Sequence, residues 1–270
     1  MSAPTAEKVA EVLRPLTDVP REAAVFCDID GTLAPIVERA EDAKVPETTA
    51  RLMATIVRRY GCVACISGRS AAEARRLVGV GGIAYAGMHG IEMLWPGETR
   101  PQMSPEVLEW AQRVRGFVQG HDTRDLRTLR VRVEDKGPIW AYHWRGAHDE
   151  QAAHERVKEL AAAAEEEGFH VHWGRKVLEV RPPLPIDKGQ AIRALVERCP
   201  VRAALFGGDD VTDLDAFEAL DELVAGGQLA QAVRVGLRSD EGPPEIVERA
   251  DLAVEGVAGF RTVLQTLAEG

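Results

Sequence analysis

Residues 23–32 read AAVFCDIDGT, an apolar run that ends in two aspartates, a glycine and a threonine. The run Ala23–Cys27 predicts a strand buried on both faces, because such strands are continuously apolar instead of alternating. Asp28 and Asp30 follow the carboxyl end of this strand, where open α/β sheets bind ligands. Gly31 permits a sharp turn that exposes backbone amides to an anion. Asp-Gly is also common in plain hairpin turns, so this motif needs support from the rest of the chain.

Apolar runs and amphipathic stretches alternate on both sides of the motif. Further strands are expected at Cys62–Ile66, Ile83–Ala86, Ala203–Phe206, Val233–Val235 and Leu252–Val254. Helices are expected at Pro46–Tyr60, at Ala71–Val78 behind an N-cap at Ser70, at Lys188–Cys199 behind an N-cap at Asp187, and beginning over Leu214–Leu220. Strands that alternate with helices predict an α/β fold with a Rossmann-like parallel-sheet core.

Residues 104–183 break this alternation and predict an inserted α+β domain. The expected order is a helix, strands at Leu129–Val133 and Ile139–Trp144 joined as a hairpin through residues 135–138, a long helix at His148–Glu167, and strands at Phe169–His172 and Lys176–Val180. The flanks, Trp95–Gly97 and Arg181–Pro185, are rich in proline or glycine and predict hinges. The core therefore comprises residues 1–103 and 184–270.

The chain has 270 residues and a formal charge of −10, from 43 acidic and 33 basic side chains. This acidity argues against binding to nucleic acid or to an anionic membrane, because both require a basic surface. No apolar run approaches the roughly 20 residues of a membrane span, and no secretion signal begins the sequence, so a cytoplasmic location is expected. The insert is nearly neutral, with 13 basic and 14 acidic side chains, so most of the negative charge belongs to the core.

Four cysteines are too few for a scaffold held by disulfides. Cys62 and Cys65 have CxxC spacing within a predicted strand, where residues three apart point to opposite faces and are badly placed to share a metal. We expect the cysteines to be buried structural residues.

Two further clusters offer groups for a phosphate. Ser67-Gly68-Arg69-Ser70 follows a predicted strand and presents a hydroxyl and free amides, although Ser70 as a plain helix cap explains part of it. Lys188 lies at a helix start, where its charge opposes the helix dipole but would balance a phosphoryl group. An ordinary surface lysine is the alternative.

Residues 208–213, GDDVTD, place three carboxylates within five residues behind a predicted strand. Such carboxylates repel one another unless a cation lies among them. Ligation by oxygen atoms alone favours Mg²⁺ over zinc, for which no Cys/His cluster exists. The alternative is a helix N-terminus, which also favours acidic residues.

In this order, the four motifs resemble those of the haloacid-dehalogenase-like (HAD-like) phosphohydrolases, and the insert resembles the C2-type cap of that superfamily. Five segments resemble one family within this superfamily, the trehalose-6-phosphate phosphatases. They are residues 86–92 (AGMHGIE), 133–137 (VEDKG), 142–145 (YHWR), 174–183 (GRKVLEVRPP) and 208–217 (GDDVTDLDAF). The resemblance extends from about Val25 to Phe217. Met88 and Leu214 depart from the family pattern, where a serine and an acidic residue are common.

The resemblance implies Mg²⁺-dependent hydrolysis of trehalose 6-phosphate through an aspartyl-phosphate on Asp28, with Asp30 as general acid and base. It implies metal ligation by the Asp28 carboxylate, the Asp30 carbonyl and Asp209, with Asp210 and Asp213 in support. The phosphate-binding residues that it implies are Gly31, Thr32, Ser67, Gly68 and Lys188.

The resemblance assigns sugar recognition to the inserted cap. Glu134 and Lys136 share one strand face through their two-residue spacing, as do His143 and Arg145, with Trp144 on the opposite face. An ordinary polar sheet face with cross-strand salt bridges is the alternative. The predicted substrate-binding residues are Arg69, His89, Glu134, Lys136, His143, Arg145, Arg175, Lys176 and Glu179.

Three other functions fit parts of the pattern. Another C2-capped sugar phosphatase, acting on mannosyl-phosphoglycerate or sucrose phosphate, would share the core motifs. A receiver-type signalling module also combines Mg²⁺, a phosphoacceptor aspartate, a hydroxyl residue and a lysine, but lacks the DxDGT pattern and the insert. A haloacid dehalogenase needs no Mg²⁺ and usually lacks the second carboxylate. The expected partner is a small sugar phosphate, supplied by a trehalose-6-phosphate synthase on a separate chain, and a monomer is compatible with the sequence.

Overall fold

The computed structural model describes residues 4–37, 39–121, 124–239 and 242–270. By its internal contacts the chain divides into two compact units. The first unit comprises Met1–Gln102 and Ile186–Gly270, and the second unit is Met103–Pro185.

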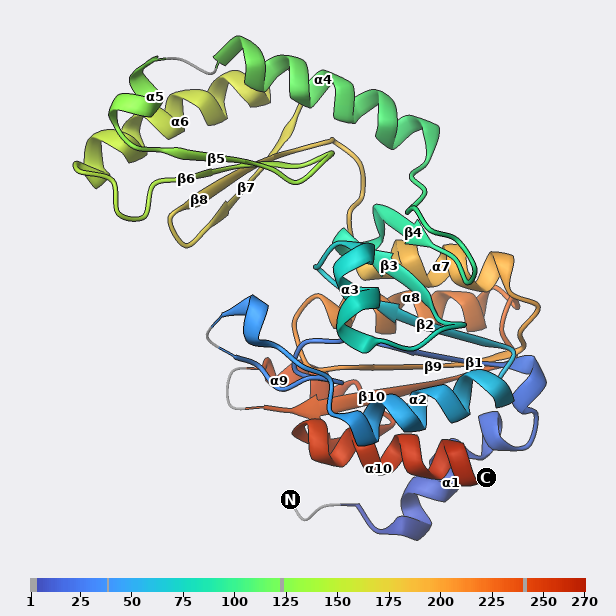
Figure 1. Cartoon of the computed structure of the whole chain (residues 1–270). Helices are drawn as coiled ribbons and strands as arrows, with labels where there is room; N and C mark the ends of the chain where they lie inside the picture. The colour runs from blue at the N-terminus through green and yellow to red at the C-terminus, as the bar shows by residue number, and fades with distance from the viewer. Residues whose placement is uncertain (1–3, 38, 122–123, 240–241) are drawn as a thin grey trace. The chain divides into compact units, whose positions relative to one another are not determined.

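The first unit is built on a seven-stranded sheet with the strand order β11-β10-β9-β1-β2-β3-β4 (Figure 1). Neighbouring strands are parallel except for β3 and β4, which are antiparallel. The central strand β1 pairs with β9 and β2, so that Ala24 lies between Ala204 and Cys62. The strands are β1 (Ala23–Cys27), β2 (Cys62–Ile66), β3 (Ala84–Gly87), β4 (Glu92–Leu94), β9 (Ala203–Gly208), β10 (Gln231–Arg238) and β11 (Leu252–Glu255). This confirms the predicted α/β fold with a parallel-sheet core.

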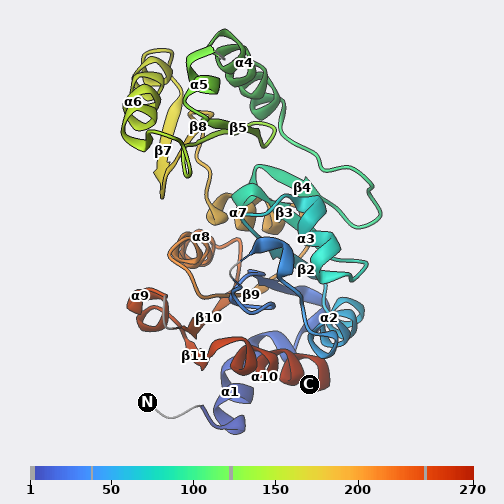
Figure 2. The ribbon, with the colours of Figure 1, turned by 60° about the vertical axis from the view of Figure 1, so that its left-hand side comes forward.

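Helices cover both faces of this sheet (Figures 1 and 2). One layer contains α1 (Ala6–Thr17), α2 (Glu47–Arg59), α3 (Ala71–Val78) and α10 (Gly256–Glu269), and the other contains α7 (Lys188–Arg198), α8 (Asp213–Ala225) and α9 (Pro244–Glu248). Short 3-10 turns, Pro20–Glu22, Ala40–Asp42 and Met88–Gly90, lie in the loops. Val25 and Cys27 of β1 pack into the first layer and Phe26 into the second, which is why this strand is apolar throughout.

The structure confirms the N-cap predicted at Ser70 and adds a capping box and a C-cap to α3. The Ser70 hydroxyl accepts a hydrogen bond from the Glu73 backbone, and the Glu73 carboxylate accepts one from the Ser70 backbone, which together form a capping box. Gly79 ends the helix in the left-handed region with a φ of 68°. This cap fixes where the loop from β2 to α3 enters its helix, and that loop carries Ser67 and Arg69.

The second unit has a four-stranded antiparallel sheet with the order β5-β6-β8-β7. Its elements are α4 (Pro105–His121), α5 (Arg124–Thr128), β5 (Arg132–Asp135), β6 (Trp140–His143), α6 (Glu150–Glu166), β7 (His170–Gly174) and β8 (Val177–Arg181). Helices α4 and α6 lie along one side of this sheet (Figure 1), and Tyr142, Leu178 and Val180 pack with them in one apolar cluster. Between β5 and β6 the Lys136 N–H donates to the Ile139 carbonyl at 2.9 Å, which confirms the predicted hairpin.

Two expectations for this unit are wrong in detail. The strand predicted from Leu129 begins only at Arg132, because residues 129–131 form the turn that ends α5: the Leu129 N–H donates to the Asp125 carbonyl and Arg130 has a φ of 56°. Phe169 is not part of a strand either. Its N–H donates to the Ala164 carbonyl at the end of α6, and β7 starts at His170.

The cysteines fall into two kinds. Cys65 packs into the layer of α2 and α3, and Cys62 into that of α7, which confirms that the two point to opposite faces. Cys27 and Cys65 are buried free thiols, as expected. Cys62 is also buried, as expected, but it forms a disulfide with Cys199 that the sequence did not predict, and Cys199 is only half-buried. Among the described residues, no helix is both long and apolar enough to cross a membrane.

Candidate active site

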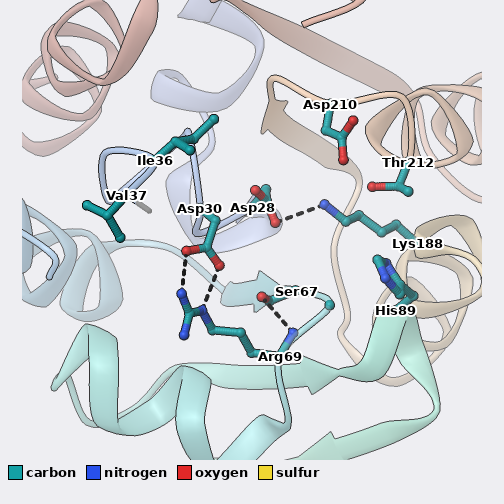
Figure 3. A pocket seen from close by; sticks show the side chains of 11 residues that line it. Asp28, Asp30, Ile36, Val37, Ser67, Arg69, His89, Lys188, Asp210 and Thr212 are labelled. Atoms are coloured by element: carbon teal, nitrogen blue, oxygen red, sulfur yellow. Dashed lines mark hydrogen bonds and ion pairs between the residues drawn. The ribbon is translucent and has the colours of Figure 1, made fainter. Parts of the chain in front are cut away.

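Loops at the carboxyl ends of β1, β2 and β9, together with the start of α7, surround a cavity of about 470 Å³ in the first unit (Figure 3). All four predicted core motifs contribute to its walls. Its lining residues are Asp28, Asp30, Ile36, Val37, Ser67, Gly68, Arg69, His89, Lys188, Asp210 and Thr212.

The turn after β1 places Asp28 and brings it close to the GDD loop. The Asp28 side chain is buried, and its N–H donates to the Gly207 carbonyl at 2.9 Å. Gly31 has a φ of 81°, and a Cβ there would overlap the carboxylate of Asp209, so only glycine fits. The Thr32 hydroxyl donates to Asp209 Oδ1 at 3.2 Å. Gly31 and Thr32 therefore join the first motif to the fourth.

Lys188 is the first residue of α7, behind the N-cap Asp187, and it is only 2% exposed. Its Nζ donates to Asp28 Oδ1 at 2.8 Å and to Asp213 Oδ1 at 2.6 Å. The alternative of an ordinary surface lysine is therefore wrong. One ammonium group here connects the motifs that follow β1 and β9.

Burial sets the ionisation of these groups. Burial raises the pKa of Asp28 to about 8, with the attraction of Lys188 opposing it and the repulsion of Asp213 adding to it. Burial also raises the pKa of Asp209 to about 6, again with repulsion from Asp213. For Lys188 burial favours the neutral amine, but Asp213 and Asp28 raise its pKa above the usual lysine value. Three buried carboxylates thus share one ammonium, a charge balance that favours an added cation.

The donor set fits a hard divalent cation. Asp28, Asp209 and Asp213 each offer a carboxylate oxygen, and these oxygens lie within 4.8 Å of one another. Oxygen donors at such spacing, completed by water, suit Mg²⁺. Asp213 already accepts at both oxygens, because its Oδ2 receives the N–H groups of Asp209 and Asp210 at 2.8 and 2.9 Å. It is therefore suited to holding the loop in shape, which leaves Asp28 and Asp209 as the better ligands.

Asp30 and Arg69 form an ion pair at the cavity wall (Figure 3). Arg69 donates from Nε and from Nη2 to the two carboxylate oxygens of Asp30, both at 2.7 Å. Such bidentate pairs fix geometry as well as charge. Arg69, one of the predicted substrate-binding residues, thus contacts Asp30, the residue expected to act as acid and base.

The loop after β2 is shaped by close contacts. Ser67 is 1% exposed, and its Oγ accepts the Arg69 N–H at 3.2 Å. A Cβ on Gly68 would come within 2.9 Å of the His89 ring, so glycine lets that ring approach. Met88 and His89 both lie in the left-handed region, with φ values of 52° and 58°. Such strain in non-glycine residues is typical of functional sites.

In the second unit, the predicted sugar-binding residues fall into separate groups. Lys136 Nζ donates to Glu179 Oε1 at 2.9 Å, and His143 Nε2 lies 2.7 Å from Glu134 Oε2. Arg145 donates to the Arg175 carbonyl at 3.3 Å. Lys176 instead contacts Glu150 at 2.5 Å, so the structure does not bring it to Glu179. Trp144 packs with the helices, on the face opposite His143 as predicted.

Sequence reasoning missed several residues that the structure places in these sites. Arg181 donates to Glu179 through Nε at 3.0 Å and through Nη2, and its two-residue spacing from Glu179 was the available signal. Together with Lys136 it holds the pKa of Glu179 below the usual value, against the effect of burial. Ile36, Val37 and Thr212 line the cavity, and no local pattern distinguishes them.

Known proteins resemble this chain over most of its length. The trehalose-phosphatase family model matches residues 26–244. A trehalose-phosphate phosphatase of Mycobacterium marinum is 36% identical over 220 residues, which cover 75% of this chain and 52% of that protein. The chain spans about half the length of the curated relatives it matches.

Solved structures support the fold. Aspergillus fumigatus trehalose-6-phosphate phosphatase superposes with a TM-score of 0.68 at 24% identity, covering 100% of this chain and 99% of that one. A haloacid dehalogenase-like hydrolase from Bacteroides thetaiotaomicron superposes with a TM-score of 0.59 at 14% identity, over 90% and 98% of the two chains. The fold is therefore HAD-like, as predicted. Since the family model covers most of the sequence, the chain belongs to the trehalose-phosphatase family.

Proposed function

We propose that the chain is a Mg²⁺-dependent phosphatase that hydrolyses trehalose 6-phosphate to trehalose and inorganic phosphate. The observation that carries this proposal is the buried cluster in which Lys188 bridges Asp28 and Asp213 beside Asp209. A lone aspartate would suffice for a turn, but three buried carboxylates around one ammonium cost folding free energy and suggest a catalytic purpose.

In the first step a carboxylate oxygen of Asp28 attacks phosphorus, and the bond from phosphorus to the sugar oxygen breaks. Asp30 donates a proton to that leaving oxygen, so trehalose departs and Asp28 carries the phosphoryl group. Asp30 then takes a proton from water as the water oxygen attacks phosphorus. The bond to Asp28 breaks, which releases phosphate and restores the carboxylate. Proton transfer of this kind contributes about 10²–10⁴-fold to the rate.

The remaining groups bind and orient. Lys188 and the Ser67 hydroxyl lie at the cavity where phosphoryl oxygens would be bound, and the amides around Gly31 and Gly68 can add hydrogen bonds. Asp28, the Asp30 carbonyl and Asp209 would hold Mg²⁺, with Asp210 and Asp213 in support. When bound, Mg²⁺ neutralises phosphoryl charge and polarises the P–O bonds. Asp30 takes up a proton from solvent before it acts as the acid, and the Arg69 guanidinium, hydrogen-bonded to its carboxyl group, orients it in the cavity.

We further propose that the second unit recognises the sugar. Its sheet carries Glu134, His143 and Glu179 with half-buried donors and acceptors, as a molecule rich in hydroxyls requires. A synthase is the proposed source of the phosphorylated disaccharide. The test is phosphate release from trehalose 6-phosphate, sucrose phosphate, mannosyl-phosphoglycerate and glucose 6-phosphate, with Mg²⁺ and with EDTA. The highest kcat/KM should belong to trehalose 6-phosphate, and a clear preference for another ester would contradict the proposal.

The covalent step has its own test. Asp28→Asn should lower kcat by at least about 10³-fold, because the amide is not nucleophilic. The matched control is Asp18→Asn, a change in the loop after α1, which should retain full activity. Both variants should keep the circular dichroism spectrum of the parent. Retained activity in Asp28→Asn would remove this residue as the nucleophile.

A further inference from the structure

Cys62 and Cys199 form a disulfide in the first unit, far apart in sequence at a separation of 137 residues. Their Cα atoms lie 6.2 Å apart, within the range that a disulfide spans. Cys62 is the first residue of β2, and Cys199 is the residue that caps the C-terminal end of α7. The bond therefore joins the sheet to the helix that carries Lys188.

Local structure brings these two thiols together. Cys62 points into the layer of α7 and α8 and belongs to the same apolar cluster as Ile192 and Leu195. The Cys199 N–H donates to the Leu195 carbonyl at 2.9 Å, which ends α7 and holds Cys199 against the same cluster. Cys27 and Cys65 lie on the other face with their sulfur atoms 4.0 Å apart, and they remain free.

The two partners differ in access to solvent. Cys62 is buried, with 8% exposure, whereas Cys199 is half-buried at the end of its helix. A soluble reagent can reach Cys199 more easily than Cys62. Thiol–disulfide exchange depends on such access as well as on the thiolate fraction. Cys27 and Cys65 are both fully buried and should not react in the folded protein.

We propose that Cys62 and Cys199 are a reversible redox pair that locks α7 to β2, with Cys199 as the entry thiol and Cys62 as the resolving thiol. The oxidant is a small disulfide of the glutathione class. The Cys199 thiolate attacks it, forms a mixed disulfide and releases one thiol. The Cys62 thiolate then attacks the Cys199 sulfur, forms the internal bond and releases the second thiol. Two protein thiols are oxidised and one external disulfide is reduced to two thiols.

The bond acts on stability and lies away from the chemistry. Cys62 begins β2, at the end opposite Ser67, which follows the strand and lines the cavity. The loop that it closes contains the whole second unit, because residues 103–185 lie between the two cysteines. Closing so long a loop removes many unfolded conformations and stabilises the folded state.

The first test counts thiols in the wild-type protein under denaturing conditions. After incubation with oxidised glutathione we expect two thiols per chain, from Cys27 and Cys65, and four after reduction with dithiothreitol. The oxidised protein should unfold at a temperature higher by roughly 5–15 °C than the reduced protein. Four thiols after oxidation, or equal unfolding temperatures, would overturn the proposal. Neither readout depends on phosphatase activity.

The second test assigns the two roles by intact mass. Cys62→Ser, oxidised in the folded state, should retain one glutathione per chain, attached to Cys199, because no resolving thiol is present. Cys199→Ser should take up none. The matched control Cys65→Ser should form the internal bond as the parent does. A glutathione adduct on Cys199→Ser, or none on Cys62→Ser, would contradict the assigned order.

Discussion

Lys188 donates to Asp28 and Asp213 in a place from which water is almost excluded. Removing one partner of a buried ion pair leaves the remaining charges buried and unpaired, which typically lowers the free energy of unfolding by about 3–5 kcal/mol. We therefore expect Lys188→Met to lose activity and to lower the free energy of unfolding by roughly that amount. Chemical denaturation at pH 7.5 measures the second effect.

The control for this prediction is Lys158→Met. Lys158 pairs with Glu155 on the surface at 2.9 Å, with both side chains at least half exposed. Exposed pairs contribute only about 0–1 kcal/mol, so this variant should unfold close to the parent. An equal loss of unfolding free energy in Lys188→Met and Lys158→Met would show that the burial of Lys188 does not set its contribution to stability.

Arg69 is expected to act through Asp30 by fixing the orientation of its carboxylate. Arg69→Ala should reduce kcat by roughly 10-fold or more, because a bidentate pair is lost and Asp30 is no longer oriented. Arg69→Lys keeps the charge but not the paired geometry, and should recover only part of the rate. Steady-state kinetics separate this effect from substrate binding. If only KM rises and kcat is unchanged in both variants, Arg69 contacts the substrate instead.

At the scale of elements, the sheet of the second unit offers a test of sugar recognition. Glu179 accepts from Lys136 and Arg181 and is held ionised by them. Glu179→Gln removes that charge, and we expect KM for trehalose 6-phosphate to rise by about 10-fold. Hydrolysis of p-nitrophenyl phosphate, which has no sugar, should not change. A parallel loss with both substrates would mean that Glu179 only supports the fold.

Elements with strong local signals could be predicted from the sequence alone. The apolar runs predict the observed bounds of β1 and β2, and the N-cap at Ser70 predicts those of α3, because each is specified by its own residues. The helix α1 was not predicted, although Val9, Leu13 and Leu16 follow a helical spacing. The strand β4 has three residues, which is too few for a pattern, and it forms through pairing with β3 and with Gln102.

The candidate site also has parts that could be predicted from the sequence and parts that could not. Clusters such as residues 28–32 and 208–213 stand out because carboxylates and glycines gather behind buried strands. The pairing of Asp30 with Arg69 and the bond between Cys62 and Cys199 could not be predicted, since each depends on how separate strands and helices pack. Contacts between residues of separate elements have no signal in the local sequence.

At the scale of the whole molecule, we expect the stability of the folded state to depend on pH and on Mg²⁺ together. The pKa of Asp28 is raised from its ordinary value to about 8, so in the absence of metal the native state binds a proton that the unfolded chain releases. That stabilisation is complete below the unfolded pKa near 4 and is lost as pH rises through about 8. The raised pKa of Asp209 also stabilises the protonated native state, and this contribution is lost as pH rises through about 6.

Mg²⁺ competes with these protons, so its binding should strengthen as pH rises. We expect about 5–10 mM Mg²⁺ to raise the unfolding temperature more at pH 8 than at pH 5.5. Differential scanning fluorimetry with and without EDTA measures this difference. In Asp28→Asn the pH dependence should shrink. A larger increase at pH 5.5 than at pH 8 would contradict the coupling.

The pairing of β1 with β9 also has a consequence for how the protein is made. Ala23 in β1 lies opposite Ala203 in β9, so about two thirds of the chain is synthesised between the two partners. During synthesis, one edge of β1 stays unpaired until residues 203–208 leave the ribosome. An apolar strand with an unpaired edge is prone to aggregate. We therefore expect the yield of folded protein to depend on the rate of translation, or on chaperones that cover this edge, until β9 has been synthesised.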